Sequence, residues 1–179
     1  ANLDVFFDAG FRMLAPTHFF DNEVGGSAHG LEQGGLSELG RSAIRRMQAK
    51  GMVVDLAHAS AKTIDDVLGI STHPVVVSHT GVKATCAGPR NLSDAQLRGI
   101  AATGGVIGIG FWPDAVCGSS IGAITKGIRH TVDTVGAEHV ALGSDFDGTT
   151  AVPFDAARLS RLTEALLSAG FTPSGLRLI

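Results

Sequence analysis

Three histidines and one aspartate stand directly after apolar runs, and these four residues are the best placed in the sequence to do chemistry. His18, His58, His79 and Asp145 close the segments MLAPTH, VVDLAH, VVVSH and ALGSD. If the runs are parallel strands, their ends converge on one mouth, so the four side chains meet there despite their separation in sequence. One histidine after a strand is commonly a structural hydrogen-bonding residue, but three in equivalent positions indicate a site.

His58 and His79 are the best candidates for metal ligands, because neutral imidazole binds Zn²⁺ and related ions. We expect their ring nitrogens to lie roughly 3–4 Å apart, since each bond to zinc is about 2.0–2.1 Å long. A catalytic zinc takes three protein ligands and a water, so at least one more ligand must come from elsewhere. Asp145 is a natural general base that could take a proton from an activated water and pass it to a leaving amine.

Two further polar residues have both a functional and a structural interpretation. Arg90 follows Gly88-Pro89 and could hold a substrate carboxylate with two parallel hydrogen bonds, or it could be a solvated loop residue. Asp147 could support Asp145 or have a structural role only. The histidines that do not follow apolar runs are expected to be structural or at the surface, His29 in a loop and His139 at the opposite end of a strand; they are His29, His73, His130 and His139.

The segments that must position these residues alternate between apolar runs and amphipathic stretches. The runs are nearly continuous in Val, Ile, Leu and Ala, which is typical of strands buried on both faces, so we expect a parallel sheet covered by helices. The expected strands are 12–15, 52–57, 74–78, 106–111 and 140–143.

Capping residues and glycines mark the helices between these strands. The first helix is expected to begin at Ser37, to bury the stripe Leu39, Ala43 and Met47, and to end at Gly51. Ser93 and Gln96 form a capping-box pattern in front of 97–102. Further helices are expected at 121–135, ending at Gly136, at 155–169, and from Thr172-Pro173 to the last residue.

Five strand–helix units in this order fit an α/β fold, either an open doubly wound sheet or part of a (β/α)8 TIM barrel. Neither a G-x-G-x-x-G nor a G-x-x-x-x-G-K-[ST] phosphate loop is present. The formal charge of −3 gives no electrostatic basis for binding nucleic acid, and 44% hydrophobic residues exclude a disordered chain. No apolar run approaches the roughly 18 residues of a transmembrane helix, and 1–15 show no signal-peptide pattern.

The run from Asp145 to Thr149 also spells D-x-D-G-T, which resembles the nucleophile loop of haloacid-dehalogenase-type phosphatases. In that family the motif opens the domain, and a Lys and further acidic residues follow on later strands. Here only 30 residues follow Thr149 and none of them is a Lys. The phosphatase interpretation is therefore the weaker alternative.

Taken together, several short segments resemble the membrane (renal-type) dipeptidase family, which are metal-dependent enzymes with an amidohydrolase-like (β/α)8 barrel. The segments run in family order over nearly the whole chain. They are APTH at 15–18, GGL at 34–36 with Gly40, VDLAH at 54–58, VSH at 77–79, RNL at 90–92, 108–111, and GSDFDG at 143–148.

The resemblance implies a role for each matching residue. His58 and His79 would ligate one of two zinc ions, and Asp145 would transfer protons. His18 would contact the substrate and polarise the scissile carbonyl, and Arg90 would bind the C-terminal carboxylate. The implied reaction is hydrolysis of a small dipeptide substrate by a metal-bound hydroxide.

Two family features are missing, namely an H-x-D pair on the first barrel strand and a metal-bridging Glu on the third. We therefore expect 1–179 to be the C-terminal part of one barrel domain, with strands four to eight and an incomplete zinc site. The strand at 12–15 would then have an unpaired edge that favours self-association, so a homo-oligomer is possible. The alternative is an inactive family member or a metal-free domain that binds a small molecule.

Cys86 and Cys117 lie in loops that leave neighbouring expected strands at the same mouth. They form either a disulfide, which some secreted members of the resembled family have at these places, or two free thiols. A bridge would close a loop of 31 positions and contribute about 3–4 kcal/mol in the chain-entropy model. A disulfide would favour export to an oxidising compartment, and free thiols would fit the cytoplasm.

Overall fold

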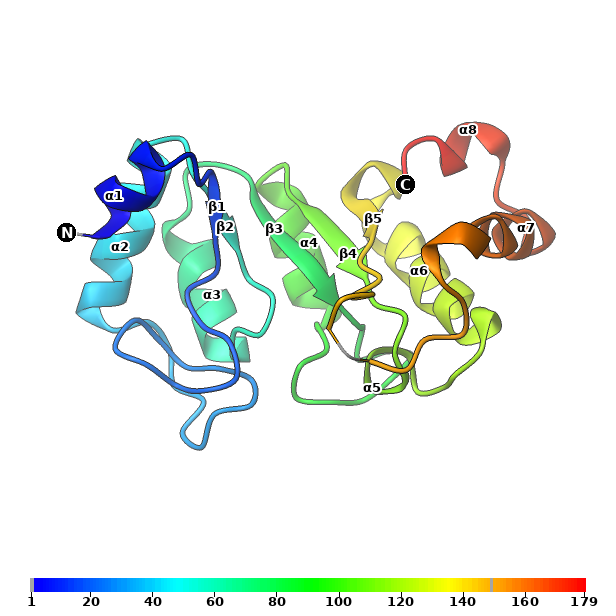
Figure 1. Ribbon diagram of the computed structural model, residues 1–179, viewed down its shortest axis with the longest axis horizontal. Coiled ribbons are helices and arrows are strands. Elements are labelled where there is room, and N and C mark those ends of the chain that lie inside the picture. Colours follow the sequence, from blue (N-terminus) through cyan, green and yellow to red (C-terminus); the bar gives the residue numbers. More distant parts are fainter. Residues whose placement is uncertain (1, 149) are drawn as a thin grey trace.

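The computed structural model describes residues 2–148 and 150–179 and contains one five-stranded parallel sheet (Figure 1). Every strand pairs with the next strand in the chain, so the spatial order equals the sequence order. The predicted parallel sheet is confirmed, although each strand differs from the expected one by one or two residues at an end. The strands are β1 (Met13–Leu14), β2 (Val53–Asp55), β3 (Val75–Thr80), β4 (Val106–Ile109) and β5 (Val140–Leu142).

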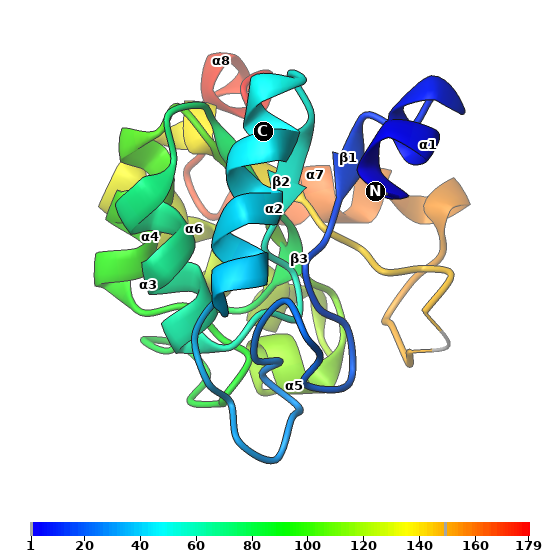
Figure 2. The same ribbon diagram turned by 90° about the vertical axis from the view of Figure 1, so that its left-hand side faces the viewer.

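Four helices cover one face of the sheet, as the view along it shows (Figure 2). They connect consecutive strands, as the parallel arrangement requires. These helices are α2 (Glu38–Ala49), α3 (Ala61–Ile70), α4 (Asp94–Ala102) and α6 (Ile121–Val135).

Shorter elements lie before the first strand, on either side of α6, and after the last strand. The helices at 2–8 and 113–116 and the turn at 137–139 were not predicted from the sequence, and no bounds were predicted for α3. These elements are α1 (Asn2–Asp8), α5 (Pro113–Val116), the 3-10 turns Ala137–His139 and Ala156–Arg158, α7 (Ser160–Ser168) and α8 (Pro173–Leu176).

The core lies between the sheet and the four helices α2, α3, α4 and α6. Strand side chains such as Val54, Val77 and Ile107 are buried against it, and so are the inward-facing residues of the helices. Full burial of one such side chain contributes about 1.5–3 kcal/mol. The helix residues concerned include Ile44, Val67, Leu97, Ile100, Ile124 and Ile128.

The expected apolar stripe of α2 is confirmed at Met47 and wrong at Leu39, while Ala43 is half-buried. Leu39 is 60% exposed, whereas Gly40, Ile44 and Met47 are buried. The larger Ile44 side chain determines the buried face, and Gly40 allows a close approach, because a Cβ there would lie 2.0 Å from the Val24 carbonyl oxygen. The helix is thus packed tightly against the loop that precedes it.

The helix ends follow the capping signals more closely. Ser93 and Gln96 form the predicted capping box of α4, and α6 ends at Gly136, whose φ is 94°. The helix expected at 155–169 is instead a 3-10 turn followed by α7. Thr172 caps α8 as expected, but this helix ends at Leu176, before the end of the chain.

Both edges of the sheet lack a second partner among the described residues, because β1 pairs only with β2 and β5 only with β4. Met13 in β1 is 47% exposed, and Phe11 just before the strand is 53% exposed. The unpaired edge expected at the first strand is therefore present. No helix in 2–148 or 150–179 is long and apolar enough to cross a bilayer.

Candidate active site

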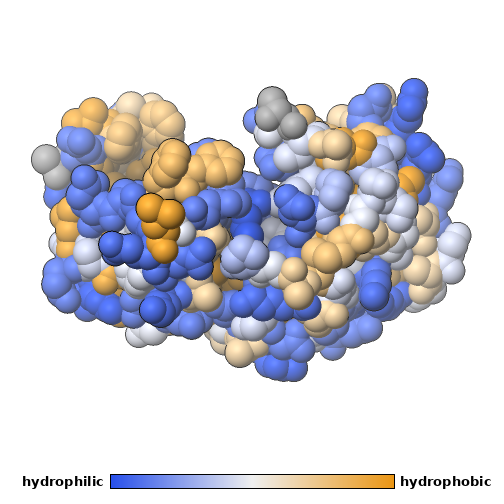
Figure 3. Space-filling model, turned by 90° about the horizontal axis from the view of Figure 1, so that it is seen from below, coloured by the Kyte–Doolittle hydropathy of each residue, from blue (hydrophilic) through white to orange (hydrophobic). Residues whose placement is uncertain are grey.

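The C-terminal ends of the strands bring three of the predicted histidines together, at the lower end of the sheet in Figure 1. The ring centroids of His18 and His58 are 4.3 Å apart, and those of His58 and His79 are 5.0 Å apart. The Nε2 atoms of His58 and His79 lie 3.0 Å from each other, within the predicted range. Viewed from this end, polar residues surround the hollow in the middle of the face (Figure 3).

Asp55, for which the sequence indicates no role, fixes the ends of β2 and β3. Its Oδ1 accepts hydrogen bonds from the backbone N–H of Ala57, at 3.0 Å, and of Ser78, at 2.9 Å. The carboxylate is buried, so these two bonds are needed to satisfy it. They set the backbone just before His58 and His79, and a buried Asp in an otherwise apolar run was the available signal.

His58 has a left-handed backbone, with φ at 65°, which is uncommon for a residue other than glycine. The loop after β1 supports it, because Ala28 N–H donates to the His58 carbonyl oxygen at 2.8 Å. In the same loop the buried Ser27 hydroxyl donates to the His18 carbonyl oxygen at 2.5 Å. One short segment therefore ties the backbones of His18 and His58 together.

Both paired imidazoles are held in the neutral form. Burial, and next the Arg90 charge, lower the pKa of His58 to about 3. The same two causes lower the pKa of His79. His79 Nδ1 lies 2.9 Å from the Ser78 hydroxyl, an arrangement that orients the ring with Nε2 toward His58. Neutral rings with facing Nε2 atoms are the form in which imidazole binds a metal.

The pair fits part of a zinc site. Two nitrogens on a tetrahedral zinc lie about 3.3 Å apart, close to the separation observed here. Within the described residues His58 Nδ1 is buried without a hydrogen-bond partner, and its Nε2 is the nitrogen that faces His79. In the described part of the chain no group of three or more His, Cys, Asp or Glu side chains is arranged to hold a metal. His58 and His79 would supply two ligands of such a site.

Arg90 lies against the imidazole pair. One guanidinium nitrogen is 3.2 Å from His58 Nε2 and 3.3 Å from the His79 carbonyl oxygen, and the guanidinium carbon is 4.9 Å from the centre of the Trp112 ring. Burial lowers the pKa of Arg90 to about 10, although Asp145 and Asp55 oppose this shift, so the side chain is a cation at neutral pH. Its buried Nε has no partner within the described residues. A cation with donors to spare suits a ligand carboxylate.

Asp145 follows β5 and belongs to the same end of the sheet. Its charge favours the protonated forms of both His79 and Arg90. Its φ is 56°, and its carbonyl oxygen accepts hydrogen bonds from Gly148 N–H and the Thr150 hydroxyl. Asp147 is exposed. Thr149, the last residue of the D-x-D-G-T pattern, lies outside the described residues.

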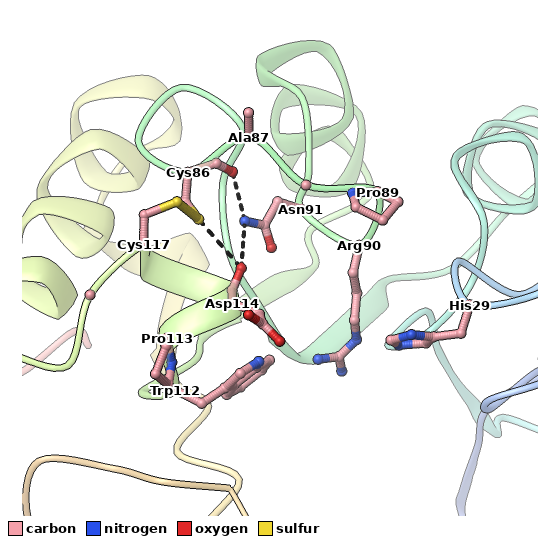
Figure 4. Close-up of a pocket in the computed structure, with 12 residues that line it drawn as sticks. His29, Cys86, Ala87, Pro89, Arg90, Asn91, Trp112, Pro113, Asp114 and Cys117 are labelled. Carbon is pink, nitrogen blue, oxygen red and sulfur yellow. Dashed lines mark hydrogen bonds between the residues drawn. A yellow bond between two sulfur atoms is a disulfide. The ribbon is translucent and has the colours of Figure 1, made fainter.

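A cavity of about 580 Å³ opens beside Arg90 (Figure 4). Its walls include the loop at 86–91 and the segment at 112–118, which the Cys86–Cys117 disulfide joins with a Cα–Cα distance of 5.1 Å. The disulfide alternative is thus confirmed over the free thiols. The two cysteine loops lie at the same end of the sheet, as expected.

His29 is an exposed loop residue, as expected, and it also lines this cavity, which the sequence did not indicate. Its ring centroid is 5.5 Å from that of His58 and 5.1 Å from that of Phe19. The loop folds back because Asp21 accepts hydrogen bonds from the backbone N–H of Ser27 and Glu32. No spacing in the sequence signals that return.

The other three histidines lie elsewhere, as expected. His130 forms an ion pair with Asp94 at 2.8 Å when protonated, and His139 Nδ1 lies 2.8 Å from the Gly105 carbonyl oxygen. His73 lies 2.9 Å from the Thr72 hydroxyl. Each contact satisfies a ring nitrogen locally.

A parallel βα sheet with imidazoles, a guanidinium and a carboxylate at its C-terminal end has the architecture of part of a (β/α)8 barrel. The profile of one family, described as membrane dipeptidase (peptidase family M19), matches residues 1–179, and the chain belongs to that family. This membership replaces the phosphatase interpretation of the D-x-D-G-T pattern.

Three comparisons illustrate the relationship. An uncharacterised protein from the pqqA 5′ region of Klebsiella pneumoniae is 33% identical over 95% of this chain and 68% of its own length. An uncharacterised dipeptidase of Schizosaccharomyces pombe is 33% identical over 83% of this chain and 38% of its own.

The third relative is a solved structure, a metallopeptidase of Rhodobacter sphaeroides liganded with a phosphinate mimic of the dipeptide L-Ala-D-Ala. It is 29% identical, with a TM-score of 0.86 over 99% of this chain and 55% of that one. The chain thus spans about half the length of that enzyme, and its five strands compare with the eight of a complete barrel.

Proposed function

We propose that the full-length protein containing this chain is a zinc-dependent dipeptidase, and that residues 1–179 form the C-terminal part of its barrel. One observation carries this proposal: two neutral imidazoles with Nε2 atoms 3.0 Å apart stand beside a partly buried cationic guanidinium. The pair suits a metal, and the cation suits the free carboxylate that distinguishes a dipeptide from an internal peptide bond.

In this proposal His58 and His79 would hold a zinc ion together with ligands from outside these residues. Bound zinc supplies a Lewis acid and lowers the pKa of water. Arg90 binds the substrate's C-terminal carboxylate and so places the scissile peptide bond beside the imidazole pair. His18, whose ring lies 4.3 Å from that of His58, donates a hydrogen bond to the scissile carbonyl oxygen.

Asp145 is the proton carrier of the proposed reaction. Its carboxylate takes a proton from the attacking water and gives it to the leaving amine. Its placement after β5, with a charge that acts on both His79 and Arg90, supports this role. Gly148 leaves room for the Asp145 carboxylate in this position, because a Cβ at residue 148 would lie 2.4 Å from Asp145 Oδ1.

The competing function is a family member that binds a small molecule without metal or catalysis. Metal analysis and hydrolysis assays of the full-length protein discriminate the two. The dipeptidase proposal expects about two zinc ions per chain, as in two-metal sites, and hydrolysis of unblocked dipeptides. Absence of both zinc and hydrolysis would establish the binding domain instead.

Variants link the metal to the proposed ligands. His79→Asn should lower zinc content and abolish hydrolysis. His73→Asn is the matched control, because His73 stands before β3, at the other end of the sheet. Equal zinc retention in the two variants would remove His79 from the metal site.

The disulfide supports a second proposal, that the protein works in an oxidising compartment. Quantitative thiol labelling of the protein isolated from its source under denaturing conditions tests this. We expect no labelled cysteine until a reductant is added. Full labelling without reductant would place the protein in a reducing compartment.

A further inference from the structure

The cavity beside Arg90 carries a carboxylate that the proposed reaction does not use. Asp114, in the first turn of α5, lines the cavity together with Arg90, His29 and Trp112. Figure 4 shows its carboxylate directed toward the space between Trp112 and Arg90. Among residues 2–148 and 150–179 this carboxylate makes no hydrogen bond or ion pair. Its charge is therefore available to a ligand.

The wall that carries Asp114 is held firmly. Asn91 Nδ2 donates to the Asp114 carbonyl oxygen at 3.3 Å and to the Cys86 carbonyl oxygen at 2.7 Å. The Cys86–Cys117 disulfide closes the same wall. These bonds fix the Asp114 backbone relative to the Arg90 loop.

The Asp114 charge acts across the cavity. Burial and the Arg90 charge lower the pKa of His29, and Asp114 opposes that lowering. His29 stands on the loop after β1, on the far side of Arg90 from α5 in Figure 4. The exposed Asp114 carboxylate therefore borders the cavity as well as the solvent.

The position of Arg90 determines which part of a dipeptide would meet this carboxylate. Arg90 contacts His58 Nε2, while the cavity beside it is lined by neither His58 nor His79. With the α-carboxylate on Arg90 and the peptide bond at the imidazole pair, the side chain of the C-terminal residue points into the cavity. The N-terminal ammonium lies on the other side of the scissile bond.

We propose that Asp114 is a specificity-determining residue that makes the site prefer dipeptides ending in a cationic residue, lysine or arginine. This inference rests on the proposed function. The cationic head would pair with the Asp114 carboxylate, and its methylene stem would lie along Trp112. A cavity of about 580 Å³ has room for such a long side chain.

The test measures kcat/KM of the full-length zinc-loaded protein for Ala-Lys, Ala-Leu and Ala-Glu. Wild type should prefer Ala-Lys over Ala-Glu. Asp114→Asn should lower kcat/KM for Ala-Lys about three- to tenfold, as expected for a partly solvated ion pair, and change Ala-Leu less than about twofold. Asp114→Lys should invert the order of Ala-Lys and Ala-Glu. The control is Glu138→Gln, which removes an exposed negative charge at the opposite end of the sheet.

If Asp114→Asn left the ratios of kcat/KM among the three substrates unchanged, the inference would be overturned. An equal loss of kcat/KM for all three substrates would overturn it too, because Asp114 would then act on the dipeptide backbone or ammonium. Calorimetric binding of free L-lysine and L-leucine to the same variants makes the comparison without catalysis. Hydrolysis without an Asp114-dependent lysine preference refutes this inference alone. Absence of any hydrolysis refutes the proposed function, and the binding comparison still decides the role of Asp114.

Discussion

At the scale of single residues, Arg90 combines contacts that only a guanidinium can make together. It donates toward His58 Nε2 and the His79 carbonyl oxygen, stacks on Trp112, and keeps its Nε without a partner in the described chain. A lysine ammonium is a point charge without a planar fork. Replacing Arg90 with lysine should therefore weaken binding of the substrate carboxylate.

Arg90→Lys in the full-length enzyme should raise KM about 10- to 100-fold, since a charge-assisted hydrogen bond contributes about 1.5–3 kcal/mol. Steady-state kinetics with a dipeptide and with its C-terminal amide measure the effect. The amide lacks the carboxylate, so wild type and variant should process it equally poorly. A variant that is impaired equally on both substrates would show that Arg90 does not bind the carboxylate.

Residues of the site could be predicted from the sequence only where they follow the end of a strand. His18, His58, His79 and Asp145 were predictable because parallel strands end at one side of a sheet. His29 was not, since Asp21 and Ser27 fold its loop through side-chain hydrogen bonds that leave no periodic pattern. Asp114 was likewise unpredictable, because its place in the cavity depends on the wall that Asn91 and the disulfide build.

At the scale of elements, glycines set how closely helices approach their neighbours. Gly40 in α2 packs where a Cβ would lie 2.0 Å from the Val24 carbonyl oxygen, whereas Gly69 in α3 has nothing within 4 Å of such a position. Gly40→Ala should lower the free energy of unfolding by about 1–3 kcal/mol, because a packed contact must shift. Gly69→Ala should raise it by about 0.5–1 kcal/mol through helix propensity. Urea unfolding measures both, and a stabilised Gly40→Ala would contradict the close packing.

Asp66 joins α3 to α2 and to the loop before α2. Burial raises the pKa of Asp66, but hydrogen bonds from Arg41 and from Leu36 N–H lower it by more, so it lies below the ordinary value of 3.8. A carboxyl with a depressed folded-state pKa contributes stability above its unfolded-state pKa and loses it as pH falls through the folded-state value.

Asp66→Asn should therefore cost about 1–2 kcal/mol at pH 7, and this cost should shrink as the pH falls below about 4. Urea unfolding of both proteins from pH 7 to pH 2.5 measures the difference. Asp65→Asn on the same helix is a control for helix charge. A difference that stays constant with pH would show that ionisation of Asp66 contributes nothing.

Capping signals and apolar periodicity predicted some features of the helices but not others. The capping box of α4 and the glycine end of α6 were predicted because each depends on a few neighbouring residues. The buried face of α2 was predicted only in part, since the close contact of Gly40 with Val24, in the loop that precedes the helix, leaves no periodic pattern. The split of 155–169 into a 3-10 turn and α7 likewise left no signal in the sequence.

At the scale of the whole molecule, the open edge at β1 is the most consequential surface of the isolated chain. Its unpaired backbone groups and the exposed Met13 side chain favour pairing with another chain. We expect the isolated chain to sediment above its monomer mass of 18.4 kDa at tens of micromolar. Met13→Lys should shift it toward the monomer, because an edge charge opposes strand addition. A monodisperse wild-type monomer that unfolds cooperatively would rule out edge pairing.

The order of the strands has a consequence for synthesis of the chain. Each strand pairs with its predecessor in the sequence, from β1 to β5. As the polypeptide leaves the ribosome, every new strand therefore meets a neighbour that has already been made. Among the five described strands none has to wait for a distant partner, and the sheet can grow one unit at a time in the direction of translation.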